Sequence, residues 1–217
     1  MPTYSFSPKV AQISAVLALL VGILTLLGWY FNIPVFRSLA TPFSAMSHTT
    51  AVCFIAAGLS IFIHTTGRAR FARVLGLGIT VIAGLTLIEI GLSADFGIDR
   101  LLFSAAHPLY PLLERMSPIT AFNMCLLGIV LTIGIGRPSR LNALLMLVVA
   151  SSSGIGLLGL LYNVSSLYAL PAYASMALTT ALTFMVVAIG HFYSQPSPFL
   201  TILRSRTSAG LTGRRLI

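Results

Sequence analysis

Charged residues are scarce in this sequence. They make up only 8% of the 217 residues, whereas soluble domains carry about 25%. Hydrophobic residues make up 57%, and the mean hydropathy is +0.96. This balance excludes an ordinary soluble domain and is typical of an all-α protein that crosses a membrane several times.

Acidic residues and cysteines are also few. There are four Asp or Glu residues, and the two cysteines, Cys53 and Cys125, both lie in apolar segments. Such cysteines indicate small buried hydrophobes rather than a disulfide or a zinc site, so we expect no metal. Paired carboxylates, an activated nucleophile and a phosphate-binding loop are missing from the sequence patterns as well. We therefore do not expect an enzyme.

The net charge is +9, which raises the alternative of a nucleic-acid-binding protein. The basic residues, however, lie at the ends of apolar segments and form no basic face interleaved with aromatic residues. We therefore expect the lipid bilayer, and not nucleic acid, as the main partner.

Six apolar segments are long enough to span a hydrocarbon core, which needs about 20 helical residues. They are Val10–Tyr30, Met46–Ile63, Phe71–Ser93, Pro118–Gly136, Leu141–Tyr162 and Ala174–Phe192. The first is too long for the apolar part of a signal peptide, so we interpret it as a retained span. The sequence predicts six transmembrane helices.

The placement of Lys and Arg predicts the orientation of these spans. Ten lie at one set of segment ends or in the tail: Lys9, Arg68, Arg70, Arg73, Arg137, Arg140, Arg204, Arg206, Arg214 and Arg215. Only Arg37, Arg100 and Arg115 lie on the opposite side. The positive-inside rule then places both termini in the cytoplasm of a bacterial inner membrane.

One motif occurs three times, in Met46–Gly58, Met116–Gly128 and Met176–Ala188. Each copy has Met, then Thr four places later, Ala five places later, a bulky apolar residue eight places later and Gly or Ala twelve places later. Residues four apart share one helical face. The repeated stripe predicts an internal repeat.

The repeat and the orientation together predict three helical hairpins with approximate threefold symmetry, over residues 10–65, 71–136 and 141–193, followed by a basic tail, 194–217. The outward spans end in similar patterns that begin at Phe31, Phe96 and Tyr162 and continue through Asn or Gly. Asn or Gly tolerates the left-handed conformation that closes a helix, and Asp99 is a suitable cap for the next one. A short outer helix should follow each stop, at Val35–Leu39, Arg100–Phe103 and Ser166–Leu170.

Glu89 is the only acidic residue within a predicted span. Such residues are costly in a membrane and often mark functional sites. Glu89 could be held by Arg100, Arg115 or a motif threonine, or it could bind a ligand or carry a proton. Both readings remain open.

The histidines allow a haem or pigment as an alternative. Bis-His haem requires two imidazoles at one depth, and only His64 and His191 satisfy that condition, near the inner surface. We interpret His48, at the outer surface, as a hydrogen-bonded interfacial residue or a ligand contact. The cofactor is not identified from the sequence.

The motif threonines Thr50, Thr120 and Thr180, together with Thr49, Thr179, Thr183 and Asn123, either pack the helices or line a pocket. Threonine in a membrane helix commonly bonds the carbonyl four residues earlier, and Gly or Ala on the same face permits close packing. A pocket, if formed, should lie in the outer third, near Glu89 and His48. The middle outer loop is longer than the others and adds His107 and Tyr110 as candidate contacts.

Several short motifs together resemble a known family. They are Leu27-Gly28-Trp29, Asn32-Ile33-Pro34, Phe96-Gly97-Ile98-Asp99-Arg100, Arg115-Met116-Ser117-Pro118 and Val164-Ser165-Ser166, over about residues 24–217. The chain resembles the multi-pass membrane input region of bacterial sensor histidine kinases and diguanylate cyclases, without their output domains. The resemblance implies a signal-input module acting on a membrane or cytoplasmic protein partner. The alternatives are a non-catalytic accessory subunit of a respiratory or photosynthetic complex and, ranked lower, a small-solute carrier.

Overall fold

A computed structural model describes residues 8–38, 44–94, 97, 115–134, 139–162 and 176–194. These residues form helices and turns, with no strand among them. The elements are α1 (Pro8–Tyr30), α2 (Pro34–Arg37), α3 (His48–Thr65), α4 (Ala69–Leu92), α6 (Pro118–Ile129), the π-helical turn η1 (Val130–Gly134), α7 (Arg140–Leu161) and α9 (Leu178–Ser194).

All six predicted apolar segments are helical, and their ends differ from the prediction by a few residues. Four of the helices, α1, α3, α4 and α7, are long and apolar enough to cross a membrane. The shorter apolar helices run over Pro118–Ile133 and Leu178–Tyr193. Large hydrophobic side chains cover the outward faces of the helices. Leu17 of α1, for example, is 44% exposed, and Leu144 of α7 is 58% exposed. Such faces favour a lipid environment over water.

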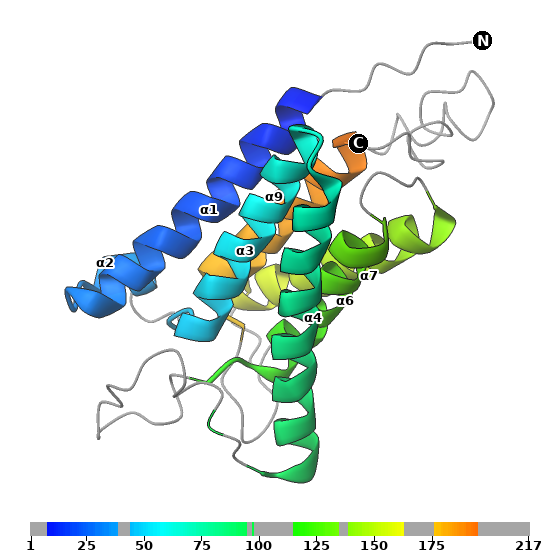
Figure 1. Ribbon diagram of the computed structural model, residues 1–217. Coiled ribbons are helices and arrows are strands. Elements are labelled where there is room, and N and C mark those ends of the chain that lie inside the picture. Colours follow the sequence, from blue (N-terminus) through cyan, green and yellow to red (C-terminus); the bar gives the residue numbers. More distant parts are fainter. Residues whose placement is uncertain are drawn as a thin grey trace.

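The helices pack in a closed ring (Figure 1). Each one contacts the next in chain order, from α1 through α3, α4, α6 and α7 to α9, and α9 returns to α1. The start of α1 and the end of α9 lie at the same end of the bundle. We call the opposite end, where α1 ends and α3 begins, the connection end.

Burial recurs in the same pattern along α3, α6 and α9. Ten positions are buried in all three copies, with the second copy 70 residues after the first and the third a further 60 residues on, as in the series Met46, Met116 and Met176. They are the first, second, fifth, sixth, eighth, ninth, twelfth, thirteenth, fifteenth and sixteenth residues of each copy. His48 and Thr49 of the first copy and Thr179 of the third are buried in addition. The same face of each helix therefore points into the ring.

The preceding helices α1, α4 and α7 share a second burial pattern. Its positions are Ala11, Ala15, Ala18, Gly22, Thr25 and Gly28 in α1; Ala72, Gly76, Ile79, Ala83, Thr86 and Glu89 in α4; and Asn142, Met146, Val149, Ser153, Gly156 and Gly159 in α7. We call residues at the same place in these series equivalent.

This register differs from the one predicted from the aromatic residues. Matching Phe31 with Phe96 implies a shift of 65 residues, whereas burial matches Ala11 with Ala72, a shift of 61. The helix ends agree with burial: Asn32 has a φ of 55° and Ser93 a φ of 52°, so both take the left-handed conformation. The helix α4 thus ends one turn before the predicted stop. At that stop Gly97 has a φ of 70°, the left-handed conformation that was predicted for it, and Phe96 and Asp99 lie outside the described residues.

The predicted stop at Asn32 is confirmed, and the short helix expected after it is α2, with Pro34 in its first turn. The short helices expected at Arg100–Phe103 and Ser166–Leu170 lie outside the described residues. Phe31 and Tyr162 are 61% and 75% exposed, as expected for aromatic side chains at a membrane interface.

Candidate functional site

The Met-Thr motif begins a helix. Ser47, which follows Met46, is the N-cap of α3: its hydroxyl oxygen accepts the Thr50 backbone N–H at 3.2 Å and lies 2.7 Å from Thr50 Oγ1. Ser117 caps α6 in the same way through Thr120, at 3.4 Å and 2.8 Å. The motif threonines therefore pair with the cap, which satisfies backbone groups that a helix start leaves open.

These serine N-caps were not predicted from the sequence, although the sequence contains a signal for them. Ser-x-x-Thr stands in both copies with the spacing of a capping box. The third copy has Ala177 at the cap position, and there Thr180 is buried without a serine before it. The backbone is unchanged, since the Ala181 N–H donates to the Ala177 carbonyl at 3.0 Å.

The motif methionines are buried just before these caps. Met46, Met116 and Met176 are 1%, 2% and 1% exposed. The Thr25 hydroxyl donates to the Met46 sulfur at 3.6 Å, and a Cβ on the equivalent Gly156 would lie 2.6 Å from Met176 Cε. The methionines thus pack against equivalent places on α1 and α7.

The motif glycines let helices touch. A Cβ added to Gly58 would lie 2.6 Å from the Ala15 carbonyl oxygen of α1. A Cβ added to Gly128 would lie 2.7 Å from the Thr80 nitrogen of α4, where Gly76 supplies the facing surface. Ala15 and Gly76 are equivalent, so α3 touches α1 at the same place as α6 touches α4. These contacts favour the packing interpretation of the motif stripe.

His48 belongs to a polar group at the connection end. Its ring lies 4.1 Å, centroid to centroid, from that of Trp29, and the Trp29 Nε1–H donates to the Met46 carbonyl at 2.9 Å. The Arg37 guanidinium lies 4.8 Å from the Trp29 ring centroid and donates to Asn32 Oδ1 at 2.6 Å. A cation over an indole face is favourable, so this group fastens α2 to the first hairpin.

Glu89 is 1% exposed and faces Arg115, with 3.3 Å between Glu89 Oε2 and the guanidinium. Arg115 also donates to the Ala94 carbonyl at 3.1 Å. Arg115 is one of the partners that the sequence suggested for Glu89. The pair joins the end of α4 to the start of the next motif, which supports a structural role.

Other predicted polar residues bond locally or to a neighbouring helix. Thr183 donates to the Thr179 carbonyl at 2.7 Å, four residues earlier, as expected for threonine in a membrane helix. Asn123 of α6 donates to Ser153 at 3.3 Å and accepts from Ser152 at 2.7 Å. Asn123 therefore ties α6 to α7 by hydrogen bonds.

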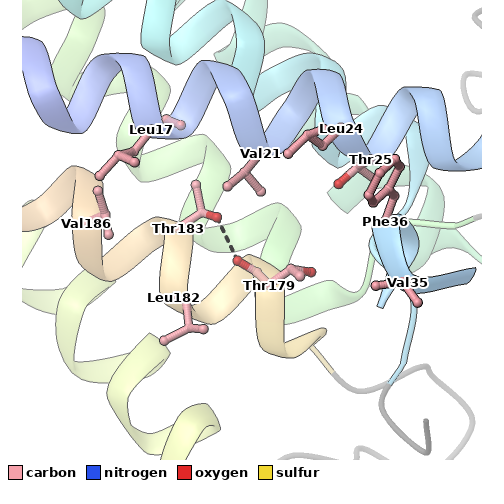
Figure 2. A pocket seen from close by; sticks show the side chains of 11 residues that line it. Leu17, Val21, Leu24, Thr25, Val35, Phe36, Thr179, Leu182, Thr183 and Val186 are labelled. Atoms are coloured by element: carbon pink, nitrogen blue, oxygen red, sulfur yellow. Dashed lines mark hydrogen bonds between the residues drawn. The ribbon is translucent and has the colours of Figure 1, made fainter. Parts of the chain in front are cut away.

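A cavity of about 380 Å³ lies between α1, α9 and α2 (Figure 2). Leu17 and Val186 lie at one end, and Val35 and Phe36 close the end nearer to Thr25. Its other lining residues are Ala18, Val21, Leu24, Thr179, Leu182 and Thr183. Glu89, His48, Thr50, Thr120 and Thr180 do not line it, so the pocket that the sequence predicted around them remains a prediction.

One polar atom at this cavity lacks a partner. Thr179 Oγ1 is buried and makes no hydrogen bond with the residues that the structure describes. Thr179 itself is 8% exposed. A buried hydroxyl without a partner costs free energy.

His107 and Tyr110 lie outside the described residues. Across the segments that are described, no cluster of three or more His, Cys, Asp or Glu side chains could hold a metal ion. Comparison with protein families, curated proteins and solved structures found no match to this chain.

Proposed function

We propose that this chain is a signal-input module of a bacterial inner membrane, which transmits a stimulus from the bilayer or the outer surface to a cytoplasmic partner. In this proposal it crosses the membrane six times as three hairpin repeats with both termini inside. The matching burial patterns and the matched Ser47 and Ser117 caps support the repeat. The resemblance to receptor input regions supports the function.

The observation that carries the proposal is the position of α9. It closes the ring against α1, it lines the cavity with Thr179 and Thr183, and it leads to the tail with its four arginines. A change in packing between α1 and α9 would therefore reach the segment that faces the cytoplasm in this topology. Such a change of helix packing can bias a partner only if it favours one of two states.

The packing between α1 and α9 differs along the length of the two helices. At the other end of the pair, Gly190 of α9 lies against Ser14 and near Ala11 of α1, where any side chain on residue 190 would collide. The pair is tight there and open around the cavity. Closing or filling the cavity would tilt α9 about this tight contact, and its cytoplasmic end would move.

The partner can be sought with a photo-crosslinking amino acid at Arg204 or Arg214 in intact cells. We expect crosslinks to a kinase, a cyclase or a response regulator, and we expect their yield to fall in the Gly190→Leu variant, which forces α1 and α9 apart. The matched control is Gly84→Leu, at a helical glycine with open space around it. Crosslinks confined to subunits of a respiratory or photosynthetic complex would instead support an accessory subunit and contradict the proposal.

A further inference from the structure

Three basic residues occupy equivalent positions at the start of α1, α4 and α7. Each is exposed and lies two residues before the first member of the burial series in its helix. They are Lys9 in α1, Arg70 in α4 and Arg140 in α7. We call these three residues the basic collar.

The collar lies at the end of the bundle opposite the connection end. Near the start of α1, Gln12 donates to Thr65 at the end of α3, with 3.3 Å between the two side chains. Near the start of α4, the Ala72 carbonyl accepts from Ser60 of α3 at 2.8 Å. The helix α7 begins shortly after η1, which packs against α4 near its start. The starts of all three helices are therefore at one end.

No carboxylate among the described residues balances the collar. The four acidic residues of the sequence all lie between positions 89 and 114. The one that the structure describes, Glu89, lies near the far end of α4 and is paired with Arg115. Within the described part of the chain, the three collar side chains make no ion pair or hydrogen bond. Their charge is available to an anion from outside the chain.

Each collar residue stands at the head of an exposed apolar stripe. The residues four and seven places later share its helical face. They are Ile13 and Val16 in α1, Val74 and Leu77 in α4, and Leu144 and Leu147 in α7, and all six are exposed.

The same three helices are among the four that are long and apolar enough to cross a membrane. The collar residue is the first or second residue of each candidate span. In a bilayer that these helices cross, the cation lies at the level of the head groups and the stripe lies against the acyl chains.

The positive-inside rule alone does not explain this register. That rule requires Lys and Arg near the ends of spans, on any face, and Arg68 already meets it beside α4. The collar adds a fixed position above an apolar stripe in three helices. An anion with an acyl chain attached matches both features, whereas a soluble anion matches only the cation.

We infer that the basic collar binds anionic lipids of the bilayer, one at each helix, with the lipid phosphate at the cation and an acyl chain along the stripe. This goes beyond the proposed signalling role and does not depend on it. It requires that α1, α4 and α7 cross the membrane, and it does not require that α6 and α9 do so.

Native mass spectrometry of the purified full chain counts bound lipids directly. Phosphatidylglycerol and phosphatidylcholine with the same acyl chains are added in turn, and soluble glycerol phosphate serves as a competitor. We expect up to three molecules of phosphatidylglycerol to be retained, each bound about 5-fold more tightly than phosphatidylcholine. An equal concentration of glycerol phosphate should not displace them, because it has no acyl chain for the stripe.

Single substitutions locate the three sites. Lys9→Gln, Arg70→Gln and Arg140→Gln should each remove one of the three lipids, because each takes away one cation. Arg68→Gln is the matched control: it removes an equal charge from an exposed residue at the same end and should leave all three lipids bound. Arg70→Lys keeps the charge and should keep the lipid on α4.

Thermal unfolding without added lipid shows whether each variant is folded. Equal retention of the two phospholipids by the wild-type chain would overturn the inference. So would equal losses of lipid in Arg68→Gln and in the collar variants, or displacement of the lipid by glycerol phosphate.

Discussion

At the scale of single residues, the ion pair between the buried Glu89 and the 30% exposed Arg115 has the clearest consequence. Removing one member of such a pair leaves the other charge without full compensation. Glu89→Gln keeps the shape of the side chain and removes its charge. We expect the free energy of unfolding to fall by about 1.5–3 kcal/mol, the range for hydrogen bonds to charged groups. Thermal unfolding in detergent measures the change.

A double-mutant cycle with Arg115→Gln is the control. If the two residues act through each other, the double variant should lose less stability than the sum of the single variants, by about 0.5–3 kcal/mol. Additive losses would show that Glu89 is held by something else. If Glu89→Gln leaves stability unchanged and alters the response to a ligand, the result would support a ligand-binding or proton-carrying role for Glu89 instead.

The helix caps give a second residue-scale prediction, because the three copies differ at one position. Ser47→Ala removes the oxygen that accepts the Thr50 N–H and should cost about 1 kcal/mol. Ala177→Ser should restore the missing cap opposite Thr180 and raise stability by a similar amount. Chemical unfolding of both variants measures the effects. Loss of stability in Ala177→Ser would contradict the equivalence of the third copy.

At the scale of elements, helix contact depends on particular glycines. A Cβ at Gly76 would lie 2.8 Å from the Thr132 nitrogen, whereas a Cβ at Gly78 would meet nothing within 4 Å. We expect Gly76→Ala to destabilise the protein by about 1–3 kcal/mol through overpacking. Gly78→Ala, two residues away in the same helix, should be stabilising by up to about 1 kcal/mol. Equal effects of the two changes on the melting temperature would show that α4 and η1 do not touch there.

The positions of the helices could be predicted from the sequence because apolar runs of this length have few alternatives. The recurrence of one buried face along α3, α6 and α9 could also be anticipated, since Met, Thr and Gly or Ala recur at fixed spacings. The register of α4 was missed because Phe96 resembles Phe31 in type, although the helix has already ended at Ser93. The end of a helix depends on the backbone conformation of a single residue, and the sequence specifies that conformation only weakly.

The candidate site was harder to predict. Glu89 stood out because a carboxyl group in a membrane span is rare, and Arg115 was among its suggested partners. The cavity could not be found in the same way, because it is lined by residues of α1, α2 and α9 and depends on how these helices pack. Thr179 was one of several threonines, and its lack of a partner is a property of the packing.

At the scale of the whole molecule, the proposed function depends on six membrane crossings. Two apolar segments are shorter than the four long spans: Leu178–Tyr193 in α9, and Pro118–Ile133 in α6 and η1. The crossing by Pro118–Ile133 can be tested by labelling on either side of it. If this segment crosses, Ala105 before it and Ser139 after it lie on opposite sides. If it does not, the three-hairpin arrangement fails and the end of α9 is not placed in the cytoplasm.

Cysteine labelling in intact cells tests this arrangement most directly. Cys53 and Cys125 are first replaced, and single cysteines are then introduced at Ala105 and Ser139. We expect a membrane-impermeant maleimide to label position 105 in intact cells and position 139 only after the cells are opened. Labelling of both positions from the same side, or in the reverse order, would contradict the six-span arrangement with both termini inside.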